Sequence, residues 1–375
     1  MPERGQTAGG VRPVSSPVEV ERAPTPAQGR LEGSVLINPL EQPGWDGLVE
    51  ARAEAWFFHG TGWARVLQET YGHVPVFAAR LAGGRLRELL PLMEVSSPWT
   101  GRRGVSLPFT DFCLPLKTEG QEAGELYEMA MAEGRARGWR YLECRSSDED
   151  WRGSSPSLVF YGHRLELGEG EEALFKKLEG PVRRGIRKAA AAGLRIQIDH
   201  TMESVETYYR LHCRTRRRHG MPPQPWRFFA NIQKYMLQPG RGFVASAWWE
   251  NKPVAGAVFL HQGRQALYKF GASDYAFQHV RPNNLLLWEG IRQCAARGCE
   301  RLHFGRTSLA NEGLRRFKLG FGTREEQIKC CKYDFRAGRF VRDVDRAEGW
   351  SNRVFALLPP RVLRLAGQLL YPHLS

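Results

Sequence analysis

The sequence of 375 residues contains no long apolar segment. None of its windows approaches the roughly 18 to 20 apolar residues that a helix needs to cross a bilayer. The opening run MPERGQTAGG lacks the apolar core of a secretory signal peptide. These absences argue against a secreted or membrane-spanning protein, and we expect the chain to be cytoplasmic.

Cysteine is also scarce, and its spacing argues against a metal site. The chain has seven cysteines, and none belongs to a CxxC pair. Cys294 and Cys299 are five positions apart and Cys330 and Cys331 are adjacent, and neither spacing suits a tetrahedral zinc site. The histidines form neither HxH nor HExxH. We therefore expect reduced, structural thiols and no bound metal.

The motifs of several large enzyme classes are missing as well. The sequence has no Walker loop, no G-x-S-x-G elbow and no dinucleotide fingerprint after a strand. Hydrolase, kinase and dehydrogenase functions therefore lose most of their support.

Positive charge is abundant. Lys and Arg number 54 against 40 Asp and Glu, which gives a formal net charge of +14. Such a charge favours anionic partners such as phosphates, nucleic acid or an acidic membrane surface. The 42% of hydrophobic residues supplies a globular core and excludes collagenous and wholly disordered chains. The length favours about two or three domains.

Two stretches of the chain resemble each other, and both are predicted to be β-hairpins. The first, VPVFAARLAGGRLRELLPLMEV, starts at Val74 and turns at Gly83-Gly84. The second, GFVASAWWENKPVAGAVFLHQG, starts at Gly242 and turns at Asn251. A helix, a glycine (Gly138 or Gly298) and a strand follow each hairpin. The pattern predicts a duplicated α/β domain, with chance similarity of common pieces as the alternative.

These signals divide the chain into four parts. Residues 1–33 are rich in Pro, Gly, Ser and Arg and are expected to be a disordered arm. We expect a first domain over residues 34–168 and a second over 169–342. Residues 343–375 form a tail in which RVLRLAGQLLYPHLS predicts an amphipathic helix. That helix either docks on the protein's own core or lies on a membrane surface.

The most basic segment spans residues 183–218, with ten Lys or Arg against three acids. Thr201 is the predicted N-cap of a helix in this segment, with Val205, Tyr208 and His212 on one face. A cluster of cations at helical spacing could bind tRNA or a diphosphate; its members are Arg183, Arg184, Arg187 and Lys188. A second cluster, Arg214 and Arg216 to Arg218, lies at a helix C-terminus, where the helix dipole stabilises cations without any ligand.

Three runs of sequence carry a family resemblance. They are RPNNLLLWEGIRQCAARGCERLHFGRTSLANEGLRRFKLGFG from Arg281, VRRGIRKAAAAGLRI from Val182, and VSLPFTDFCLPL from Val105. Together they resemble the FemAB-like branch of the GNAT acyltransferase superfamily over roughly residues 45 to 335. The resemblance implies an α/β (α+β) fold of two tandem GNAT-like domains, each a mixed, mostly antiparallel sheet flanked by helices.

The same resemblance implies an acyltransferase. Its best understood members attach amino acids from aminoacyl-tRNA to the peptidoglycan precursor lipid II, and others accompany exopolysaccharide or exosortase systems. The implied donor is aminoacyl-tRNA or acyl-CoA, with no permanently bound cofactor. The implied acceptor is an amine of a cell-envelope precursor or polysaccharide, reached from the cytoplasm with peripheral contact to the inner membrane. A CoA-dependent N-acetyltransferase and a non-catalytic RNA- or membrane-binding protein are the alternatives.

The resemblance also assigns candidate catalytic residues. Lys318 matches the Lys of the family's F-K-x-G-F motif and could hold a donor phosphate or the developing oxyanion; the alternative is a solvated surface lysine. Asp111 is the candidate base or an acceptor that positions the amine, or else it stabilises a turn. Tyr268 orients substrate or packs in the core. Arg306 lines the same cleft or forms a structural ion pair.

The candidate donor site departs from the GNAT pattern. Ordinary GNAT enzymes bind the pyrophosphate of acyl-CoA in a glycine-rich loop at a helix N-terminus. Here the equivalent stretch is Arg281-Pro282-Asn283-Asn284, without those glycines. The change favours a different donor, such as aminoacyl-tRNA; a solvent-facing helix cap by Asn283 is the alternative.

Overall fold

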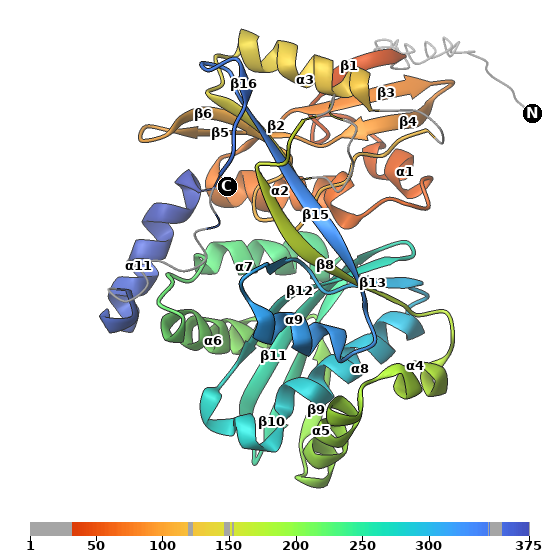
Figure 1. The fold of residues 1–375 in the computed structure, drawn as a ribbon, viewed down its shortest axis with the longest axis vertical. Helices are drawn as coiled ribbons and strands as arrows, with labels where there is room; N and C mark the ends of the chain where they lie inside the picture. The colour runs from red at the N-terminus through yellow and green to blue at the C-terminus, as the bar shows by residue number, and fades with distance from the viewer. Residues whose placement is uncertain are drawn as a thin grey trace, which may run out of the picture. The chain divides into compact units, whose positions relative to one another are not determined.

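The structure is a computed structural model that describes residues 32–118, 123–145, 151, 154–343, 345 and 355–374. The described residues form one compact unit. The fold is a mixed α/β architecture with sheets flanked by helices (Figure 1), as predicted. The predicted disordered arm lies outside the described residues except for its last two positions, and Gly33 already begins a strand.

The first half of the chain builds a small antiparallel sheet of β1, β3 and β4 and the start of a larger sheet. Its elements are β1 (Gly33–Ile37), α1 (Trp45–Glu50), η1 (Phe57–His59), α2 (Thr61–Tyr71), β2 (Val74–Pro75), β3 (Phe77–Ala82), β4 (Arg85–Leu90), β5 (Met93–Ser97), β6 (Gly101–Val105), α3 (Gly124–Ala136), β7 (Tyr141–Arg145) and β8 (Leu158–Glu166). The predicted hairpin around Gly83-Gly84 is β3–β4.

The second half continues the larger sheet and packs helices on it. Its elements are α4 (Glu171–Lys177), α5 (Gly180–Ala191), β9 (Arg195–Asp199), α6 (Met202–Arg218), α7 (Trp226–Ile232), the π-helical η2 (Gln233–Leu237), β10 (Gly242–Trp249), β11 (Lys252–Gln262), β12 (Gln265–Ser273), η3 (Tyr275–Val280), α8 (Pro282–Ala296), β13 (Arg301–His303), β14 (Thr307–Ser308), α9 (Glu312–Leu319), β15 (Arg324–Asp334) and β16 (Arg339–Phe340). The second predicted hairpin is β10–β11, with its turn at Glu250 and Asn251.

Each half contains the same parallel β-α-β unit. In the first half α3 connects β6 to β7, which pair in parallel at Gly104–Leu142. In the second half α8 connects β12 to β13, which pair in parallel at Leu267–His303. Both helices end before a left-handed glycine, as the sequence predicts: φ is 66° at Gly138 and 77° at Gly298. The repeated unit agrees with the predicted duplication.

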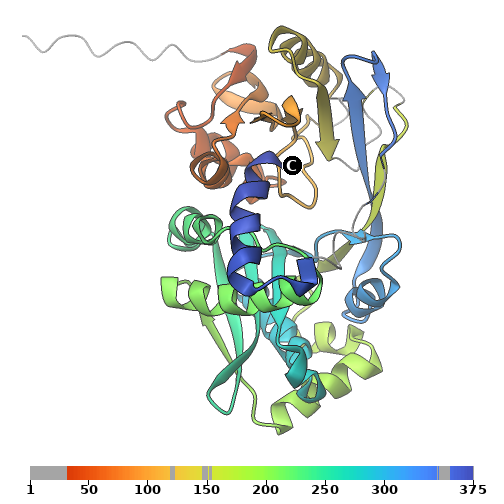
Figure 2. The same ribbon diagram turned by 90° about the vertical axis from the view of Figure 1, so that its left-hand side faces the viewer.

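One long strand, β15, joins the sheets of the two halves. The first residues of β15 pair antiparallel with β8, whereas its last residues pair with β7. The main sheet therefore runs in the order β2-β5-β6-β7-β15-β8-β13-β12-β11-β10-β9 without a break. Figures 1 and 2 show β15 extending through both halves. The sequence predicts a domain boundary after residue 168. β8 lies before this boundary, whereas the strands that pair with it, β13, β14 and β15, lie after it.

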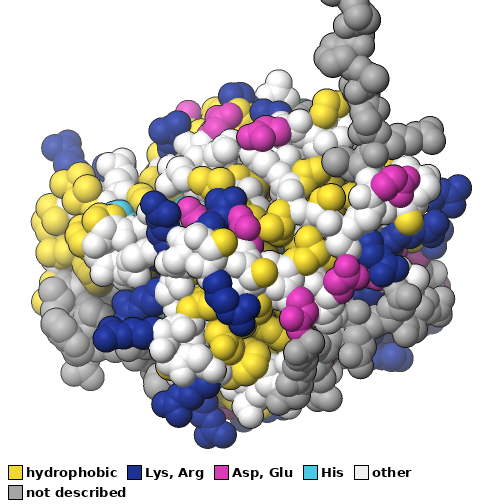
Figure 3. Space-filling model, turned by 90° about the horizontal axis from the view of Figure 1, so that it is seen from above, with side chains coloured by type: hydrophobic (Ala, Val, Ile, Leu, Met, Phe, Trp, Pro, Cys, Tyr) yellow, Lys and Arg dark blue, Asp and Glu magenta, His cyan; other side chains and the backbone are white. Residues whose placement is uncertain are grey.

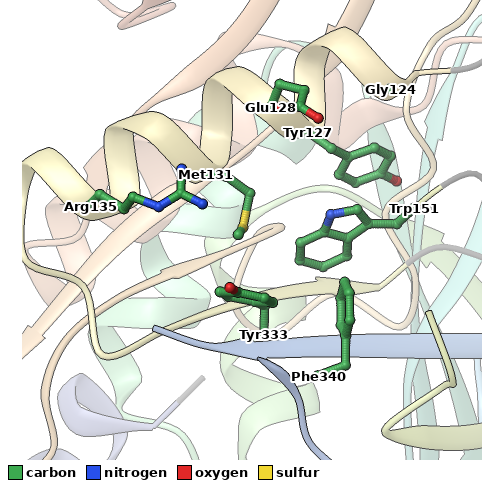
Figure 4. A pocket seen from close by; sticks show the side chains of 8 residues that line it. All are labelled: Gly124, Tyr127, Glu128, Met131, Arg135, Trp151, Tyr333 and Phe340. Atoms are coloured by element: carbon green, nitrogen blue, oxygen red, sulfur yellow. The ribbon is translucent and has the colours of Figure 1, made fainter. Parts of the chain in front are cut away.

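The first half has an aromatic core that leaves a small pocket between α3 and the β15–β16 turn. The ring of Tyr127 stacks on Trp151 at 5.1 Å, and Trp151 meets Phe340 edge to face at 4.9 Å. The pocket has a volume of about 190 Å³, and Met131 points into it (Figure 4). None of the predicted site residues lines this pocket.

The tail contains the predicted helix, α11 (Pro360–Leu370), followed by η4 (Tyr371–His373). Leu363 and Tyr371 are buried against the rest of the protein. Figure 2 shows α11 lying against the side of the protein beside both halves. Of the two positions expected for this helix, docking on the protein's own core is confirmed for its inner face.

Candidate active site

Asp111 lies in a loop of the first half that the buried side chain of Arg145 holds in place. The Arg145 guanidinium donates to the carbonyl oxygens of Leu107 and Thr110, at 3.3 Å each. Leu107 and Phe109 have left-handed backbones, with φ of 55° and 61°. Because non-glycine residues rarely adopt this conformation, the loop needs such support.

The second half presents two diverging strands to this loop. The parallel pairing of β12 with β13 ends at Leu267–His303, and β12 continues to Ser273 without β13. Asp111 spans the gap that opens there. Its Oδ2 accepts from Lys269 Nζ on β12 at 2.6 Å, and its Oδ1 accepts from the backbone N–H of Arg306 after β13 at 3.4 Å. One carboxylate from the first half thus joins both strand ends of the second.

Three cations determine the charge of Asp111. Burial alone would raise the pKa of this carboxyl, but Lys269, Arg306 and Lys318 outweigh burial and lower it to about 2. The carboxylate is therefore ionised at neutral pH and is a weak base. Of the two predicted roles, its surroundings favour the acceptor that positions an amine over the general base.

Lys318 is buried, which contradicts the alternative of a solvated surface lysine. Its Nζ donates to the carbonyl oxygens of Gly305 and Arg306, at 3.0 Å each. Burial lowers the pKa of this ammonium to about 8, and Asp111 opposes the shift. The side chain supports the same segment that Asp111 contacts from the first half.

A cavity of about 370 Å³, which we call the central cavity, opens beside this cluster. Both halves line it, and its residues are Phe109, Thr110, Asp111, Tyr208, His212, Thr215, Arg216, His219, Met221, Gln224, Lys269, Phe270, Gly271 and Arg306. The Arg306 guanidinium lies over the ring of Phe160 at 4.6 Å. The cavity therefore combines a cationic lining with a single buried carboxylate from the first half.

The wall of the central cavity on α6 has a neutral polar network. His212 Nε2 lies 2.8 Å from Gln224 Oε1, and His212 Nδ1 lies 3.3 Å from the Tyr208 hydroxyl. Burial lowers the pKa of His212 to about 3, so its imidazole is neutral at physiological pH. The face predicted for Val205, Tyr208 and His212 is buried, and Thr201 caps the helix by accepting from the Ser204 N–H.

Tyr268 lies next to the central cavity but is not among its lining residues. Its ring packs on Phe259 at 5.4 Å and Phe304 at 6.2 Å. A Cβ at Gly271 would lie 1.8 Å from the Tyr268 hydroxyl, so the glycine makes room for it. Burial raises the pKa of Tyr268 to about 12. These contacts agree with the core-packing alternative.

A second cavity, of about 500 Å³, collects much of the predicted donor site, and we call it the basic cavity. Arg184 and Lys188 of α5 line it together with Arg281 and Asn284 at the start of α8, and α9 contributes Arg316. Among the described residues, Arg184, Lys188 and Arg281 form no ion pair with a carboxylate. Glu179 is the acid in the lining.

The other predicted binding residues lie outside the basic cavity. Arg183 and Arg187 are on α5 but do not line it, and the Arg187 guanidinium lies over the Phe175 ring at 5.8 Å. Asn283 Nδ2 donates to Ser273 Oγ at 3.3 Å, so Asn283 bonds to the end of β12 instead of forming a solvent-facing cap. Arg306 lines the central cavity.

The short helix α9 lines the basic cavity and supports a segment beside the central cavity. Its Lys318 side chain supports the Gly305–Arg306 segment of the central cavity. Its Arg316 and Phe317, with the following Gly320, line the basic cavity. The helix α9 thus connects the basic cavity, which it lines, to the Gly305–Arg306 segment beside the central cavity.

Sequence reasoning missed two residues of this site. Lys269 is a buried lysine inside an apolar strand, and that unusual position is a signal that could have revealed it. His303 accepts the Gly305 N–H on Nδ1 at 2.9 Å and pairs through Nε2 with Glu326 Oε1 at 3.2 Å. Its partners are distant in sequence, so no local pattern indicates them.

Gly305 has no side chain and so lets the Asp111 carboxylate approach the backbone after β13. Replacement of Gly305 by alanine tests this contact. Its φ is 71°, and a Cβ there would lie 2.9 Å from Asp111 Oδ1. Gly298 has a similar φ of 77° with nothing within 4 Å. We expect Gly305→Ala to lower the free energy of unfolding by about 2 kcal/mol or more, and Gly298→Ala by about 1 kcal/mol. Urea denaturation measures both, and equal effects would contradict the contact.

Comparison with known proteins agrees with this geometry. Residues 176–324 match the family model of the acetyltransferase (GNAT) domain. These residues form a GNAT domain. The match includes α5, the diverging strands β12 and β13, and α9 with Lys318. No curated protein matches the chain in sequence.

Solved structures extend the likeness to both halves. The structure of FemX superposes with a TM-score of 0.63 at 13% identity and covers 81% of this chain and 98% of FemX. A tandem GNAT protein from the clavulanic acid biosynthesis pathway gives 0.53 at 11% identity, with 80% and 98% covered. The C-terminal domain of a putative lysylphosphatidylglycerol synthetase from Agrobacterium fabrum gives 0.52 at 12%, with 87% and 95% covered.

The GNAT part of the predicted resemblance is confirmed over residues 176–324, and the chain shares its fold with FemX and with a tandem GNAT protein. The GNAT family match also confirms the prediction of an acyltransferase. At these identities the solved structures show the shared fold, so the donor and the acceptor of the reaction are matters for proposal.

Proposed function

We propose that this GNAT acyltransferase moves an aminoacyl or other acyl group from a phosphate-bearing carrier to an amine of a cell-envelope precursor or polysaccharide sugar. The observation that carries the proposal is a pair of cavities: α9 lines the basic cavity, and its Lys318 supports the segment that carries Arg306 into the lining of the central cavity. The basic cavity contains Arg184 and Lys188 of α5 together with Arg281 at the start of α8. The central cavity contains Asp111, which lies between Lys269 and Arg306. The cations of the basic cavity suit the phosphates of a carrier, and the charged groups of the central cavity suit the transfer of the acyl group.

Attack of an amine on the carbonyl forms a C–N bond and an oxyanion; collapse of the oxyanion breaks the bond to the carrier, whose leaving oxygen or sulfur takes up the proton that the amine loses. The central cavity has a surplus of positive charge, because Lys269, Arg306 and Lys318 surround the single carboxylate of Asp111. Preorganised cations in a buried site stabilise a developing oxyanion. In this proposal Asp111 accepts an N–H of the amine and so directs the nitrogen toward the carbonyl carbon.

The donor side favours a carrier larger than CoA. Asn284 lies against α5, where a Cβ at Gly185 would be 2.9 Å from its Cγ, and Asn283 bonds to Ser273. Side chains thus occupy the place of the glycine-rich loop that CoA-dependent relatives use. Exposed arginine and lysine side chains suit the backbone phosphates of RNA. Aminoacyl-tRNA is therefore the leading donor, and acyl-CoA is the second candidate.

The test is transfer by the full-length protein. Purified protein is incubated with charged tRNA plus lipid II or a UDP-linked precursor, and separately with acyl-CoA plus the same acceptors. Mass spectrometry then detects a new amide. We expect an amide from charged tRNA. An amide from acyl-CoA alone favours an N-acetyltransferase, and no amide from either donor contradicts the proposal.

Charge reversal in the basic cavity tests the donor site. We expect Arg184→Glu with Lys188→Glu to raise the KM for the donor by tenfold or more with little change in kcat, because donor phosphates lose two cations. Arg195→Glu with Arg264→Glu reverses the same charge on β9 and in the turn before β12, outside the basic cavity. Equal effects of the two double variants would indicate general electrostatic attraction and would contradict a donor site in the basic cavity. Salt-dependent binding of uncharged RNA, without any transfer, would favour a non-catalytic RNA-binding protein.

A further inference from the structure

The outer face of α11 is apolar and exposed. Val362, Leu365 and Leu369 follow one another along the helix, with 46%, 55% and 59% of their surface exposed. Figure 3 shows hydrophobic side chains gathered at the left-hand edge, the side on which α11 lies in Figure 1. A contiguous group of large apolar side chains on a protein surface marks an interaction site more often than isolated ones do.

This face is separate from the face by which α11 binds its own protein. On the inner side, a Cβ at Gly367 would lie 2.0 Å from the Pro223 carbonyl oxygen, so the helix packs directly on the backbone after α6. The Tyr371 hydroxyl donates to the Pro222 carbonyl at 3.1 Å and accepts from Arg216 Nη2 at 2.7 Å. The docking face is therefore occupied, and the outer stripe is held in a fixed orientation.

The β5–β6 hairpin adds an aromatic side chain to the same region. Arg103 Nη2 donates to the His373 carbonyl at 2.6 Å, which anchors the end of the tail to β6. The His373 ring lies 4.2 Å from the Trp99 ring, and Trp99 is 65% exposed. Leu374, the next residue, is 48% exposed. An exposed tryptophan therefore lies beside the end of the apolar stripe.

Charge identifies the kind of partner. Arg361 and Arg364 are exposed on α11, and the segment from Phe355 to Leu374 contains no Asp or Glu. Arginines beside a leucine stripe, with tryptophan nearby, are typical of helices that lie in the headgroup region of a membrane. An acidic protein groove would suit the arginines but not an apolar stripe of this kind.

The length of α11 decides how it would meet a bilayer. Its 11 residues extend about 16 Å, roughly half of the 30 Å hydrocarbon core. Among the described residues, no helix has the length and apolar character needed to cross a membrane. A helix this short can lie along the surface but cannot cross it.

We propose that this surface docks on an anionic lipid bilayer, with the axis of α11 parallel to the membrane. Its apolar residues enter the headgroup boundary and its arginines bind lipid phosphates; the members are Trp99, Val362, Leu365, Leu369, Leu374, Arg361 and Arg364. We call it the tail face. The inference does not depend on the proposed acyl transfer, and it gives the enzyme a fixed orientation on a surface where lipid-linked acceptors lie.

Vesicle flotation of the full-length protein tests the proposal. The probes are vesicles of phosphatidylcholine alone and of phosphatidylcholine mixed with phosphatidylglycerol. We expect the protein to float with the anionic vesicles, and Leu365→Glu with Leu369→Glu to reduce the bound fraction tenfold or more. Arg361→Gln with Arg364→Gln should weaken binding to the anionic vesicles and reduce its salt dependence.

A matched control introduces the same charges elsewhere. Leu36 and Val74 are 38% and 42% exposed in the first half, so Leu36→Glu with Val74→Glu should leave vesicle binding unchanged. Urea denaturation checks that every variant folds, and transfer to a soluble amine should persist in Leu365→Glu/Leu369→Glu. Absence of wild-type flotation, or equal flotation of both glutamate variants, would overturn the proposal. So would a dimer that only Leu365→Glu/Leu369→Glu dissociates, because the tail face would then bind a second copy.

Discussion

Replacement of Lys318 by methionine is expected to lower the kcat of acyl transfer by about 100- to 1000-fold. The ammonium is the buried cation that supports the Gly305–Arg306 segment, and its charge adds to the positive potential in which the oxyanion develops. Methionine keeps most of the volume but removes the charge. Steady-state transfer with saturating donor measures the effect, with Lys177→Met as the control, since Lys177 is an exposed lysine on α4.

The pH profile separates a catalytic charge from a merely structural one. The pKa of Lys318 is about 8, so a requirement for its protonated form predicts that the rate falls as pH rises through about 8. Lys318→Arg keeps the charge at higher pH and should move this fall upward. A Lys318→Met enzyme with normal kcat, or a wild-type profile that stays flat from pH 7 to about 9.5, would contradict the assignment.

The free energy of unfolding should also change as Lys318 titrates. It should rise with pH over the range in which the rate falls. The Lys318 pKa is lowered from 10.5 in the unfolded chain to about 8 in the folded protein. Between these values the unfolded chain binds the extra proton, so the free energy of unfolding should rise with pH across this window. Urea denaturation at both ends of the window should show this rise in the wild type and not in Lys318→Met.

Replacement of Asp111 by asparagine is expected to lower the free energy of unfolding by about 3 to 5 kcal/mol. The change leaves the buried ammonium of Lys269 without its carboxylate, 2.6 Å away in the wild type, and leaves one oxygen acceptor where two now bond to Lys269 and to the Arg306 N–H. Transfer activity should fall as well, because the amine loses the charged acceptor that positions it. Urea denaturation measures the stability loss.

Two further variants define the origin of this loss. Glu172→Gln breaks an ion pair with Lys176 in which both side chains are largely exposed, and it should cost less than about 1 kcal/mol. Lys269→Met combined with Asp111→Asn should recover part of the lost stability, because no unpaired charge remains buried. Equal costs for Asp111→Asn and Glu172→Gln would contradict a buried coupling between the halves.

Acid pH should weaken the same coupling. The pKa of Asp111 is lowered from 3.8 to about 2, so its ionised form stabilises the folded state fully above the unfolded value. This stabilisation is lost as pH falls through about 2. The stability difference between the wild type and Asp111→Asn should therefore shrink between these two pH values.

Local patterns predicted much of the fold. The hairpins were predicted from their turns at Gly83-Gly84 and Asn251, and the ends of α3 and α8 from the glycines that follow them. These features depend on backbone freedom at single positions, which a local pattern reveals. The sharing of β15 between β7 and β8 could not be predicted. Pairing between strands so far apart in sequence depends on which edges the folded halves leave open, and β15 itself has no unusual pattern.

The candidate site was predicted in part. Asp111, Arg306 and Lys318 do lie together, and Arg184, Lys188, Arg281 and Asn284 share the basic cavity. Lys269 was missed because an isolated lysine in a strand resembles an edge residue until its buried partner is known. The inner and outer faces of α11 likewise look similar in sequence, and contacts in the folded protein, such as the approach of Gly367 to Pro223 and the burial of Leu363, distinguish them.

The most direct test of the two-cavity account is the structure of a complex with a non-hydrolysable donor analogue, either an aminoacyl-RNA mimic or an acyl-CoA thioether. The account predicts donor phosphates bonded to Arg184, Lys188 or Arg281, with the acyl group entering the central cavity beside Arg306. A donor bound in the pocket between α3 and β16, or on any surface remote from α9, would contradict it.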